Sequence, residues 1–445
     1  MKILIAGTGD TGVHLAKMLS RESQDVVLMG DDAEVLDDLD GRYNLITYRG
    51  NVNSPADLRK AGAPGCDLFI AVTPWQNHNL IACQIAKWLG ARRTLARIDS
   101  EELLSESAAS HFAKLGVDEM VYPEYLAAQE ISRTLGHPWL ASLYPMHEGQ
   151  LAIAAVRLTP ESPLNGLCLR DFVKEEYKIH ICAICRGRDI IIPGGSDTLL
   201  AGDMVYFTTP PSPDENELRH LFGRRQLSIR RVIIAGAGKM SVALISALQG
   251  RCELTIVDSD RSRCDAIAER FDKVTVVCDD FRDVDTLREE GIASCDAFIT
   301  LSDSSEKNIV SAMVATGLGA RYTVADIEDI QYFAEADNLA IDMVVNKKLI
   351  TSSTIYQMLL DSYLQSPRCL ALESAEVAEI VAQPGSKITR RKVSQLGLKK
   401  GVTIAAVIRD GESALVGGDT QILPGDHVII FCLRGLLNHI QQLFR

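Results

Sequence analysis

Short apolar runs alternate along this chain with segments of helical periodicity. The first run, in ILIAGTGDTGVHLA (residues 3–16), leads into three spaced glycines and then into a helical pattern. A second stretch, VIIAGAGKMSVALI (232–245), repeats this arrangement. Nearly continuous apolar strands that alternate with helices are typical of a parallel sheet covered on both faces. We therefore expect two Rossmann-like, doubly wound lobes.

The two regions are copies of one unit. Gly7 and Gly236 lie at an offset of 229 (236 minus 7), and the same offset places LFIAVTPWQNHNLIACQIAKWLGAR (68–92) over AFITLSDSSEKNIVSAMVATGLGAR (297–321). Agreement over some ninety residues indicates a tandem duplication. The strands expected in the first copy are KILIAG, VVLM, LITY, LFIAVT and TLARI, and those in the second are RVIIAG, LTIV, VTVVC, AFITL and YTVADI.

A β-rich segment follows each copy. GGSDTLLAGDMVYF (194–207) matches GGDTQILPGDHVIIF (417–431) when a gap of one residue is allowed. In both, a Gly-Asp turn leads into an alternating apolar strand, which predicts a small α+β lobe. The expected domains are a first Rossmann-like lobe at 1–136, a small lobe at 137–222, a linker at 223–230, a second Rossmann-like lobe at 231–365 and a second small lobe at 366–445. The helical stretches PEYLAAQEISRTL and SSTIYQMLLDSYL, which end the Rossmann-like lobes, are suited to packing against a neighbouring lobe.

Composition narrows the class of protein. A length of 445 residues predicts two to four domains, and no apolar run approaches the roughly 20 residues of a membrane-spanning helix. The apolar run after Lys2 is too short for a signal peptide, so we expect a cytoplasmic protein. The net charge of −13 disfavours nucleic-acid binding, which needs a basic surface. The 11 cysteines form no disulfide framework, and Cys182 and Cys185 face opposite sides of a predicted strand, so we expect no metal site.

The first glycine turn has the pattern of a phosphate-binding loop. Gly7, Gly9 and Gly12 form GxGxxG between a strand and a helix. In this pattern the first glycine permits a tight turn, the second lets the backbone approach a pyrophosphate, and the third allows close helix–strand packing. The helix N-terminus adds free N–H groups and a positive dipole end.

An acid after the second strand would accept hydrogen bonds from ribose hydroxyls. In LTIVDSD this acid is Asp258, whereas in VVLMGDD the matching position is Gly30 and Asp31 is the nearest substitute. An acid here favours NAD or an adenine nucleotide over NADP.

Further polar residues follow the other strands. The duplication pairs Asn51 with Asp280 after the third strand, Thr73 with Ser302 after the fourth, and Arg97 with Asp326 after the fifth. Only the first copy thus keeps a cation that could pair with phosphate. The second copy has Ser241 in place of the third glycine, although Lys239 lies in its loop. We predict two unequal sites, the first favouring phosphate contacts and the second ribose contacts.

The sequence offers little for catalysis. Hydride transfer needs a second domain that supplies an acid or base near the nicotinamide, and only the two small β units are left for that role. No GxxxxGK[ST], GxSxG or HExxH motif occurs, and the nine histidines are dispersed, with His427 expected to be solvent-facing or structural. We therefore predict no catalytic residues and a sensor whose lobes rearrange when a ligand binds.

The chain resembles the TrkA family of peripheral cytosolic subunits of Trk-type potassium uptake systems, which are built from tandem RCK (KTN) modules. The resemblance covers essentially all 445 residues and rests on MKILIAGTGDTGVHLAKMLS, FIAVTPWQNHNLIACQIAK, ARI at 96–98, AGAGKMS…VDSD…CDD and the Gly-Asp turns of both small lobes. It implies binding of NAD(H) or ATP/ADP, homo-oligomeric assembly as a dimer or a tetrameric ring, and gating of a TrkH-like membrane subunit. Gly30, Ser241 and Asp326 depart from the family pattern.

The residues expected to contact a nucleotide, from the motifs and the resemblance together, are Gly7, Thr8, Gly9, Asp10, Thr11, Gly12, Asp31, Asn51, Thr73 and Arg97 in the first copy, and Gly236, Ala237, Gly238, Lys239, Met240, Asp258, Asp280 and Ser302 in the second.

Two other functions stay open at this point. One is an NAD-dependent dehydrogenase with an unidentified substrate, which would change the absorbance of the reduced cofactor. The other is a structural assembly factor with vestigial turns, which would show no thermal shift with any nucleotide. Which nucleotide acts, whether both sites fill and which surface meets the membrane subunit are not determined by the sequence.

Overall fold

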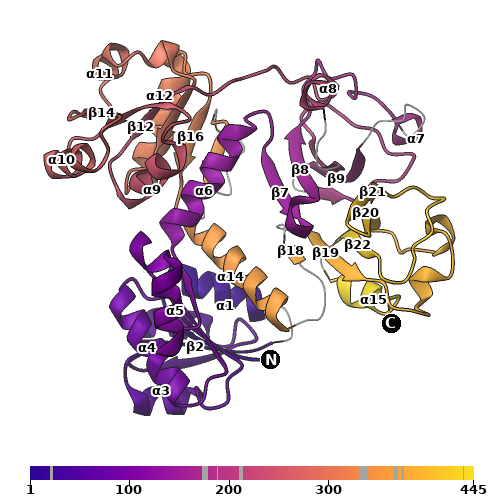
Figure 1. Ribbon diagram of the computed structural model, residues 1–445, viewed down its shortest axis with the longest axis horizontal. Helices are drawn as coiled ribbons and strands as arrows, with labels where there is room; N and C mark the ends of the chain where they lie inside the picture. Colours follow the sequence, from indigo (N-terminus) through magenta and orange to yellow (C-terminus); the bar gives the residue numbers. More distant parts are fainter. Residues whose placement is uncertain are drawn as a thin grey trace. The chain divides into compact units, whose positions relative to one another are not determined.

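The computed structural model describes residues 1–445 except 21–23, 173–178, 188, 210–213, 330–331, 333–338, 340, 364–368, 372–374, 434 and 445. The chain forms two compact units, drawn in Figure 1. Unit 1 comprises Met1–Ser132 and Arg230–Tyr356, and unit 2 comprises Arg133–Ile229 and Gln357–Arg445. Each unit therefore combines one part from each half of the chain.

The first lobe of unit 1 alternates strands and helices. Its elements are β1 (Lys2–Ala6), α1 (Asp10–Ser20), β2 (Asp25–Gly30), α2 (Ala33–Leu39), β3 (Ile46–Arg49), α3 (Pro55–Ala61), β4 (Leu68–Ala71), α4 (Gln76–Trp88), β5 (Arg93–Arg97), the 3-10 turn η1 (Glu101–Leu104), α5 (Glu106–Lys114) and β6 (Glu119–Val121). Helix α6 (Pro123–Gly136) follows.

The second lobe repeats this order. Its elements are β12 (Arg231–Ala235), α9 (Lys239–Leu248), β13 (Glu253–Val257), α10 (Arg261–Arg270), β14 (Val274–Val277), α11 (Val284–Glu289), the 3-10 turn η4 (Ile292–Ser294), β15 (Ala297–Thr300), α12 (Ser305–Leu318), β16 (Thr323–Asp326) and β17 (Met343–Val345). Helix α14 (Lys347–Tyr363) follows.

Both lobes contain a six-stranded parallel sheet. The strand orders are β3-β2-β1-β4-β5-β6 and β14-β13-β12-β15-β16-β17. The central strands β1, β4 and β15 are almost wholly buried, as their continuous apolar sequences predict. The order reverses between β1 and β4, and between β12 and β15, so each sheet has a switch point at the carboxyl end of its first strand. The prediction of two Rossmann-like lobes is confirmed.

The sixth strand of each sheet was not predicted from the sequence. These strands, β6 and β17, have three residues each, EMV and MVV. A run of three residues is too short to show the alternation of a strand. These segments form strands because they pair with the exposed edge of the fifth strand.

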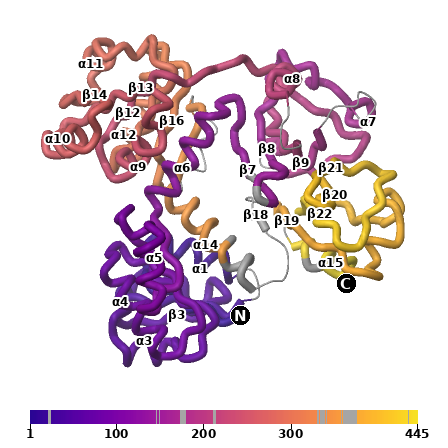
Figure 2. Tube along the Cα trace, viewed as in Figure 1, coloured from indigo at the N-terminus to yellow at the C-terminus, as the bar shows by residue number. Residues whose placement is uncertain are grey.

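The helices that end the two lobes lie between them in unit 1, as Figure 2 shows for α6 and α14. The Arg251 guanidinium of the second lobe donates to Ser132 Oγ of α6 at 3.2 Å. Lys347 Nζ of α14 lies 3.8 Å from a carboxylate oxygen of Glu124 in α6. Both helices therefore connect the lobes through polar contacts, as the sequence predicted.

Unit 2 contains two antiparallel five-stranded sheets with few helices. The first small lobe has β7 (Ser142–Met146), the 3-10 turn η2 (His147–Gly149), β8 (Leu151–Arg157), α7 (Leu169–Phe172), β9 (His180–Arg186), β10 (Asp189–Ile191), β11 (Met204–Thr209) and α8 (Glu215–Leu221). The second has β18 (Cys369–Ala371), β19 (Ala375–Val381), the 3-10 turns η6 (Lys387–Thr389) and η7 (Val393–Gln395), β20 (Val402–Arg409), β21 (Glu412–Leu415), β22 (His427–Leu433) and α15 (Leu437–Gln441). The strand orders are β10-β9-β11-β8-β7 and β18-β19-β22-β20-β21.

The two small sheets share an apolar core inside unit 2. Its buried residues come from both halves of the chain and include Leu151, Ile153, Val377, Ile429 and Phe431. Each small lobe also has a core of its own on the opposite side of its sheet. Strand residues therefore alternate between two buried faces, which explains why these strands are more apolar than those of a sheet with one wet face.

The Gly-Asp turn recognised in the sequence anchors the same ion pair in both small lobes. Asp203 and Asp426 are almost fully buried, and each receives two hydrogen bonds of 2.7–2.8 Å from an arginine, Arg186 or Arg409. Each carboxylate also accepts a backbone N–H from its own turn. The ion pairs thus connect each turn to the neighbouring strand.

Among the described residues, no helix combines the length and apolar character that a membrane span requires.

Candidate functional site

The first glycine of each loop makes the tight turn that the sequence predicted. Gly7 and Gly236 have φ values of 132° and 101°, which L side chains rarely adopt. A Cβ on Gly7 would stand 2.9 Å from the backbone nitrogen of Thr73, and one on Gly236 would stand 3.0 Å from that of Ser302. Both loops therefore pass directly over the end of the fourth strand, at the switch point of the sheet.

The second glycine of each loop faces open space. A Cβ built on Gly9 or Gly238 meets no heavy atom of the described chain within 4 Å. Gly9 is also exposed, and it directly precedes the first turn of α1. A ligand phosphate can thus approach the backbone N–H groups at the start of α1 and α9. Thr11 and Met240 are buried, so at these positions only the backbone is available.

The third position of the motif differs between the lobes. A Cβ on Gly12 would lie 2.0 Å from the carbonyl oxygen of Gly7, so α1 packs against its loop without room for a side chain. In the second lobe Ser241 is fully buried, and its hydroxyl donates to the carbonyl oxygen of Gly236 at 2.6 Å. The serine replaces close packing by a hydrogen bond and leaves the loop intact.

The acid after the second strand is held against the glycine loop in the second lobe. Asp258 is almost fully buried, and its Oδ2 accepts the backbone N–H of Ala237 at 2.6 Å. In the first lobe a Cβ on Gly30 would lie 2.6 Å from the Thr8 side chain, which fills the corresponding space. Asp31 is exposed one residue further on. Only the second lobe therefore holds the acid that follows its second strand against the loop.

Two asparagines organise the carboxyl ends of the fourth and fifth strands. Asn79 Oδ1 accepts from the backbone N–H and the hydroxyl of Thr73 at 2.9 and 2.7 Å. Its Nδ2 donates to the carbonyl oxygens of Thr73 and Arg97 at 3.0 and 2.8 Å. Asn308 makes the same four contacts with Ser302 and Asp326. In the sequence, Asn79 and Asn308 stood out only because they occupy matching positions of the repeat. That match was the one available signal that they hold the strand ends together.

The residues that end the fifth strands have opposite charge. Arg97 is half-buried, and within the described part of the chain its guanidinium forms no ion pair or hydrogen bond. Asp326 is buried, and burial raises the pKa of its carboxyl to about 7. The first lobe therefore offers a free cation at this edge, whereas the second offers an acid that is only partly ionised near pH 7.

The residues after the third strands are more peripheral. Asn51 is exposed, and its Oδ1 accepts the backbone N–H of Asn53 at 2.8 Å. Asp280 forms a 2.6 Å ion pair with Arg282, whose hydrogen bonds hold the pKa of the Asp280 carboxyl below its ordinary value. Both lie at the correct edge of the sheet, but Asp280 is engaged by its neighbour.

Each glycine loop also receives an ion pair from the other lobe of unit 1. Lys348 Nζ, from α14, lies 2.5 Å from Asp10 Oδ2 at the start of α1. Lys239 Nζ, at the start of α9, lies 2.8 Å from Asp99 Oδ2 of the first lobe. Lys348 also pairs with Glu328 at 3.2 Å. The pairs with Asp10 and Asp99 were not predicted from the sequence, because in each the two residues lie more than a hundred positions apart.

Lys347, next to Lys348, completes this charge cluster. It contacts Glu328 and lies 3.8 Å from Glu124. Burial by itself lowers the pKa of Lys347. The nearby carboxylates, of which Glu328 has the largest effect, outweigh burial and hold the pKa above its ordinary value. A charged lysine is therefore retained at the junction of the two lobes.

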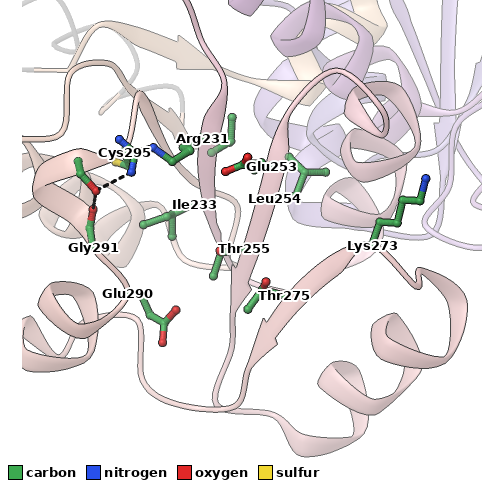
Figure 3. A pocket seen from close by; sticks show the side chains of 12 residues that line it. Arg231, Ile233, Glu253, Leu254, Thr255, Lys273, Thr275, Glu290, Gly291 and Cys295 are labelled. Carbon is green, nitrogen blue, oxygen red and sulfur yellow. Dashed lines mark hydrogen bonds between the residues drawn. The ribbon is translucent and has the colours of Figure 1, made fainter.

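A pocket of about 310 Å³ lies at the opposite edge of the second sheet (Figure 3). It is lined by the beginnings of β12, β13 and β14, with Arg231, Glu253 and Lys273 at its margin. The Arg231 guanidinium donates to Ser294 Oγ at 3.1 Å, and Ser294 in turn donates to the Gly291 carbonyl. This edge holds the amino ends of the strands and no glycine loop, so the pocket is separate from the predicted nucleotide site.

Family models identify the class of protein that this architecture belongs to. The TrkA-N domain model matches residues 3–123 and 232–347, and the TrkA-C domain model matches residues 153–223 and 377–445. The fold and the two glycine loops thus belong to a tandem chain of TrkA-N and TrkA-C domains. The chain is a member of the TrkA family of Trk system potassium uptake proteins.

Relatives match along essentially the whole chain. The Trk system potassium uptake protein TrkA of Haemophilus influenzae is 30% identical, over 97% of this chain and 95% of the relative. TrkA homolog 1 of Methanosarcina mazei is 28% identical over 100% of both chains.

Solved structures are similar in fold at low identity. The structure described as the GsuK channel bound to NAD matches with a TM-score of 0.62 at 16% identity, over 100% of this chain and 78% of that one. The structure of GsuK bound to ADP matches with a TM-score of 0.51 at 13% identity, over 80% of this chain and 69% of that one. The predicted RCK architecture is confirmed by these similarities and by the family models.

Proposed function

We propose that the chain is the nucleotide-responsive regulatory subunit of a Trk-type potassium uptake system. It binds NAD(H) or ATP/ADP at the carboxyl edges of its two parallel sheets. Binding changes the relative stability of two arrangements of its lobes, and a TrkH-like membrane subunit responds to the difference. The names of the full-length relatives support the potassium uptake system, and the NAD and ADP complexes of GsuK support the ligand class.

The open space at the second glycine of each loop carries this proposal. Gly9 and Gly238 precede α1 and α9, and a side chain at either position would meet no described neighbour within 4 Å. Packing inside the protein therefore explains the glycines at positions 7 and 12 but does not explain Gly9 and Gly238. Close approach of a pyrophosphate to the backbone does explain them.

We propose that the two sites are unequal. The first has the free cation Arg97 and lacks an acid at the end of its second strand, where Gly30 stands, which favours contacts with phosphate. The second has Asp258 against its loop and the buried acid Asp326 in place of the arginine, which favours contacts with ribose. The remaining predicted contacts contribute mainly through the backbone and the exposed side chains at the same edge.

We further propose a regulatory protein without catalytic activity. It assembles as a homo-oligomer and lies in the cytoplasm, on the inner face of the membrane through its partner. Its domain boundaries follow the duplication, with lobes at 1–136, 137–222, 231–365 and 366–445 joined by a linker at 223–230.

Calorimetric titration of the full chain with NAD, NADH, ATP and ADP tests the ligand class. Gly9→Ala should weaken binding at the first site by about 10- to 150-fold, which corresponds to losing one charge-assisted hydrogen bond of about 1.5–3 kcal/mol. Gly238→Ala should do the same at the second site. Gly317→Ala is the matched control, because Gly317 is exposed in α12 and also has an open Cβ position. Unchanged affinity in both loop variants would refute the proposed site.

The regulatory role is tested by potassium uptake in cells that carry the membrane subunit. Uptake should depend on nucleotide with the wild-type chain and lose that dependence with the Gly9→Ala and Gly238→Ala double variant. The dehydrogenase alternative predicts a change in the absorbance band of reduced nicotinamide with some substrate. Sustained turnover of this kind would contradict the regulatory assignment.

A further inference from the structure

Two histidines and one glutamate converge on a single point inside unit 2. His147 begins the 3-10 turn after β7, Glu379 lies within β19, and His427 begins β22. The Nδ1 atoms of both histidines lie 2.7 Å from the same oxygen, Oε1 of Glu379. The imidazole centroids are 4.6 Å apart, and one ligand atom from each of the three residues lies within 4.8 Å of the others.

The sheet places two of these residues on one face. In the antiparallel pair β19·β22, Glu379 stands opposite Ile429, and His427 is two residues from Ile429. Side chains two residues apart on a strand point to the same face, so Glu379 and His427 are diagonal neighbours. Ile429 belongs to the apolar core shared by the two small sheets, together with Met146, which precedes His147. Packing of this core therefore brings His147 to the pair.

The glutamate is buried and incompletely paired. Glu379 is only 7% exposed, and its second oxygen, Oε2, is buried without a hydrogen-bond partner among the described residues. In the described part of the chain its ion-pair partners are the two histidines, with no lysine or arginine. A buried carboxylate is costly unless a positive charge compensates it. Either protonated imidazole or a bound cation can supply that charge.

We propose that His147, Glu379 and His427 form a binding site for a divalent transition metal ion, with Zn²⁺ as the best match. Two imidazole nitrogens and one carboxylate oxygen are the donor set that Zn²⁺ and its neighbours prefer, whereas Ca²⁺ and Mg²⁺ prefer oxygen alone. A fourth coordination position remains for water or another ligand. No metal site was expected from the sequence, and this proposal goes beyond that expectation.

The observed geometry needs only a small adjustment to hold the ion. Ligand bonds of about 2.0–2.2 Å in a tetrahedron place the donor atoms about 3.3–3.6 Å apart. The two nitrogen–oxygen distances are now 2.7 Å and must open by about 0.6–0.9 Å. The His147 and His427 side chains are 22% and 37% exposed, so an ion can enter from solvent. Each Nδ1 binds the metal through its lone pair, so the proton of each neutral imidazole lies on Nε2 when the ion is bound.

A metal at this point would connect the two small lobes of unit 2. His147 belongs to the first small lobe, and Glu379 and His427 belong to the second. Because the ligands come from both halves of the chain, the ion stabilises the paired state of the two lobes over any separated state. This site is independent of the nucleotide loops, which lie in unit 1.

Zinc titration of the untagged, chelator-treated full chain tests the proposal. We expect one Zn²⁺ per chain by elemental analysis, a higher unfolding temperature with Zn²⁺, and visible absorption bands of tetrahedral Co²⁺ on substitution. Ca²⁺ and Mg²⁺ should neither bind at this site nor raise the unfolding temperature. Glu379→Gln and His427→Gln should weaken Zn²⁺ binding by more than about 100-fold, above the range expected of residues that only orient a ligand. His147→Asn serves as the third variant, because asparagine tolerates the positive φ of 46° at this residue.

Matched controls separate this site from adventitious binding. His111→Asn and His439→Gln remove exposed histidines elsewhere and should leave Zn²⁺ affinity unchanged. Each variant is first compared with wild type in metal-free unfolding and in nucleotide binding, which confirms that it folds. Zn²⁺ binding that is equal in wild type and the three site variants would overturn the proposal, as would binding that disappears with Cys278→Ser, a change at an exposed thiol.

Discussion

Replacement of Asn79 by aspartate tests whether the buried asparagine holds the carboxyl edge of the first sheet together. Asn79 is fully buried, and its Nδ2 donates to the carbonyl oxygens of Thr73 and Arg97 at 3.0 and 2.8 Å. Asn79→Asp keeps the size of the side chain but turns both contacts into oxygen–oxygen contacts. Each buried group left without a partner costs about 1–3 kcal/mol, so two such groups give a local loss of about 2–6 kcal/mol.

Hydrogen exchange measured by mass spectrometry on peptides from β4, α4 and β5 reads this local stability. Amides that exchange through opening of this region should do so at least about 30-fold faster in Asn79→Asp, since 1.4 kcal/mol is a factor of ten. Asn77→Asp is the matched control, because Asn77 is exposed on the same helix and a carboxylate in its first turn is mildly favourable. Exchange rates in Asn79→Asp within about twofold of those in the control would refute the reasoning.

Three further outcomes follow from the described contacts. Gly12→Ala should destabilise the first lobe, because its Cβ would lie 2.0 Å from the Gly7 carbonyl oxygen, and a thermal midpoint equal to wild type would contradict this packing. Burial lowers the pKa of His180 to about 4. As the pH falls below about 6.5, His180 is therefore protonated in the unfolded chain but stays neutral in the folded chain, which favours unfolding. Unfolding in urea should therefore show about 2 kcal/mol less stability at about pH 5 than at about pH 7, and His180→Asn should remove most of this difference. Arg409→Met should cost about 2–4 kcal/mol by leaving Asp426 buried and unpaired, whereas the double variant Arg409→Met, Asp426→Leu should recover most of the loss in the same assay.

The sequence predicted the two parallel sheets apart from their sixth strands. Continuous apolar runs such as KILIA and LFIA are typical of strands buried on both faces, and the glycine pattern places the first loop after β1. Because the duplication has a constant offset, it predicted the same strand–loop–helix arrangement in the second lobe. It also showed that Thr73 and Ser302 occupy equivalent positions. The apolar runs and the glycine pattern are local features of the sequence, and the duplication is a repeat within it. Both kinds of feature can be recognised without a structure.

Contacts between distant segments could not be predicted in this way. Lys348 meets Asp10 across 338 positions, and His147 meets Glu379 across 232. His427 was expected to be solvent-facing or structural, and the sequence did not indicate its partner Glu379, which comes from the neighbouring strand β19. No local pattern encodes such pairs, because they depend on which faces of separate lobes pack together.

A crystal structure of the full chain with bound NAD or ADP tests the central claim most directly. We expect the ligand phosphates within hydrogen-bond distance of the backbone N–H groups that begin α1 or α9, beside Gly9 or Gly238, with the ribose near Asp258 in the second lobe. Ligand found instead in the pocket beside Arg231 at the opposite edge of the sheet, or both loops without ligand at saturating concentration, would contradict the account.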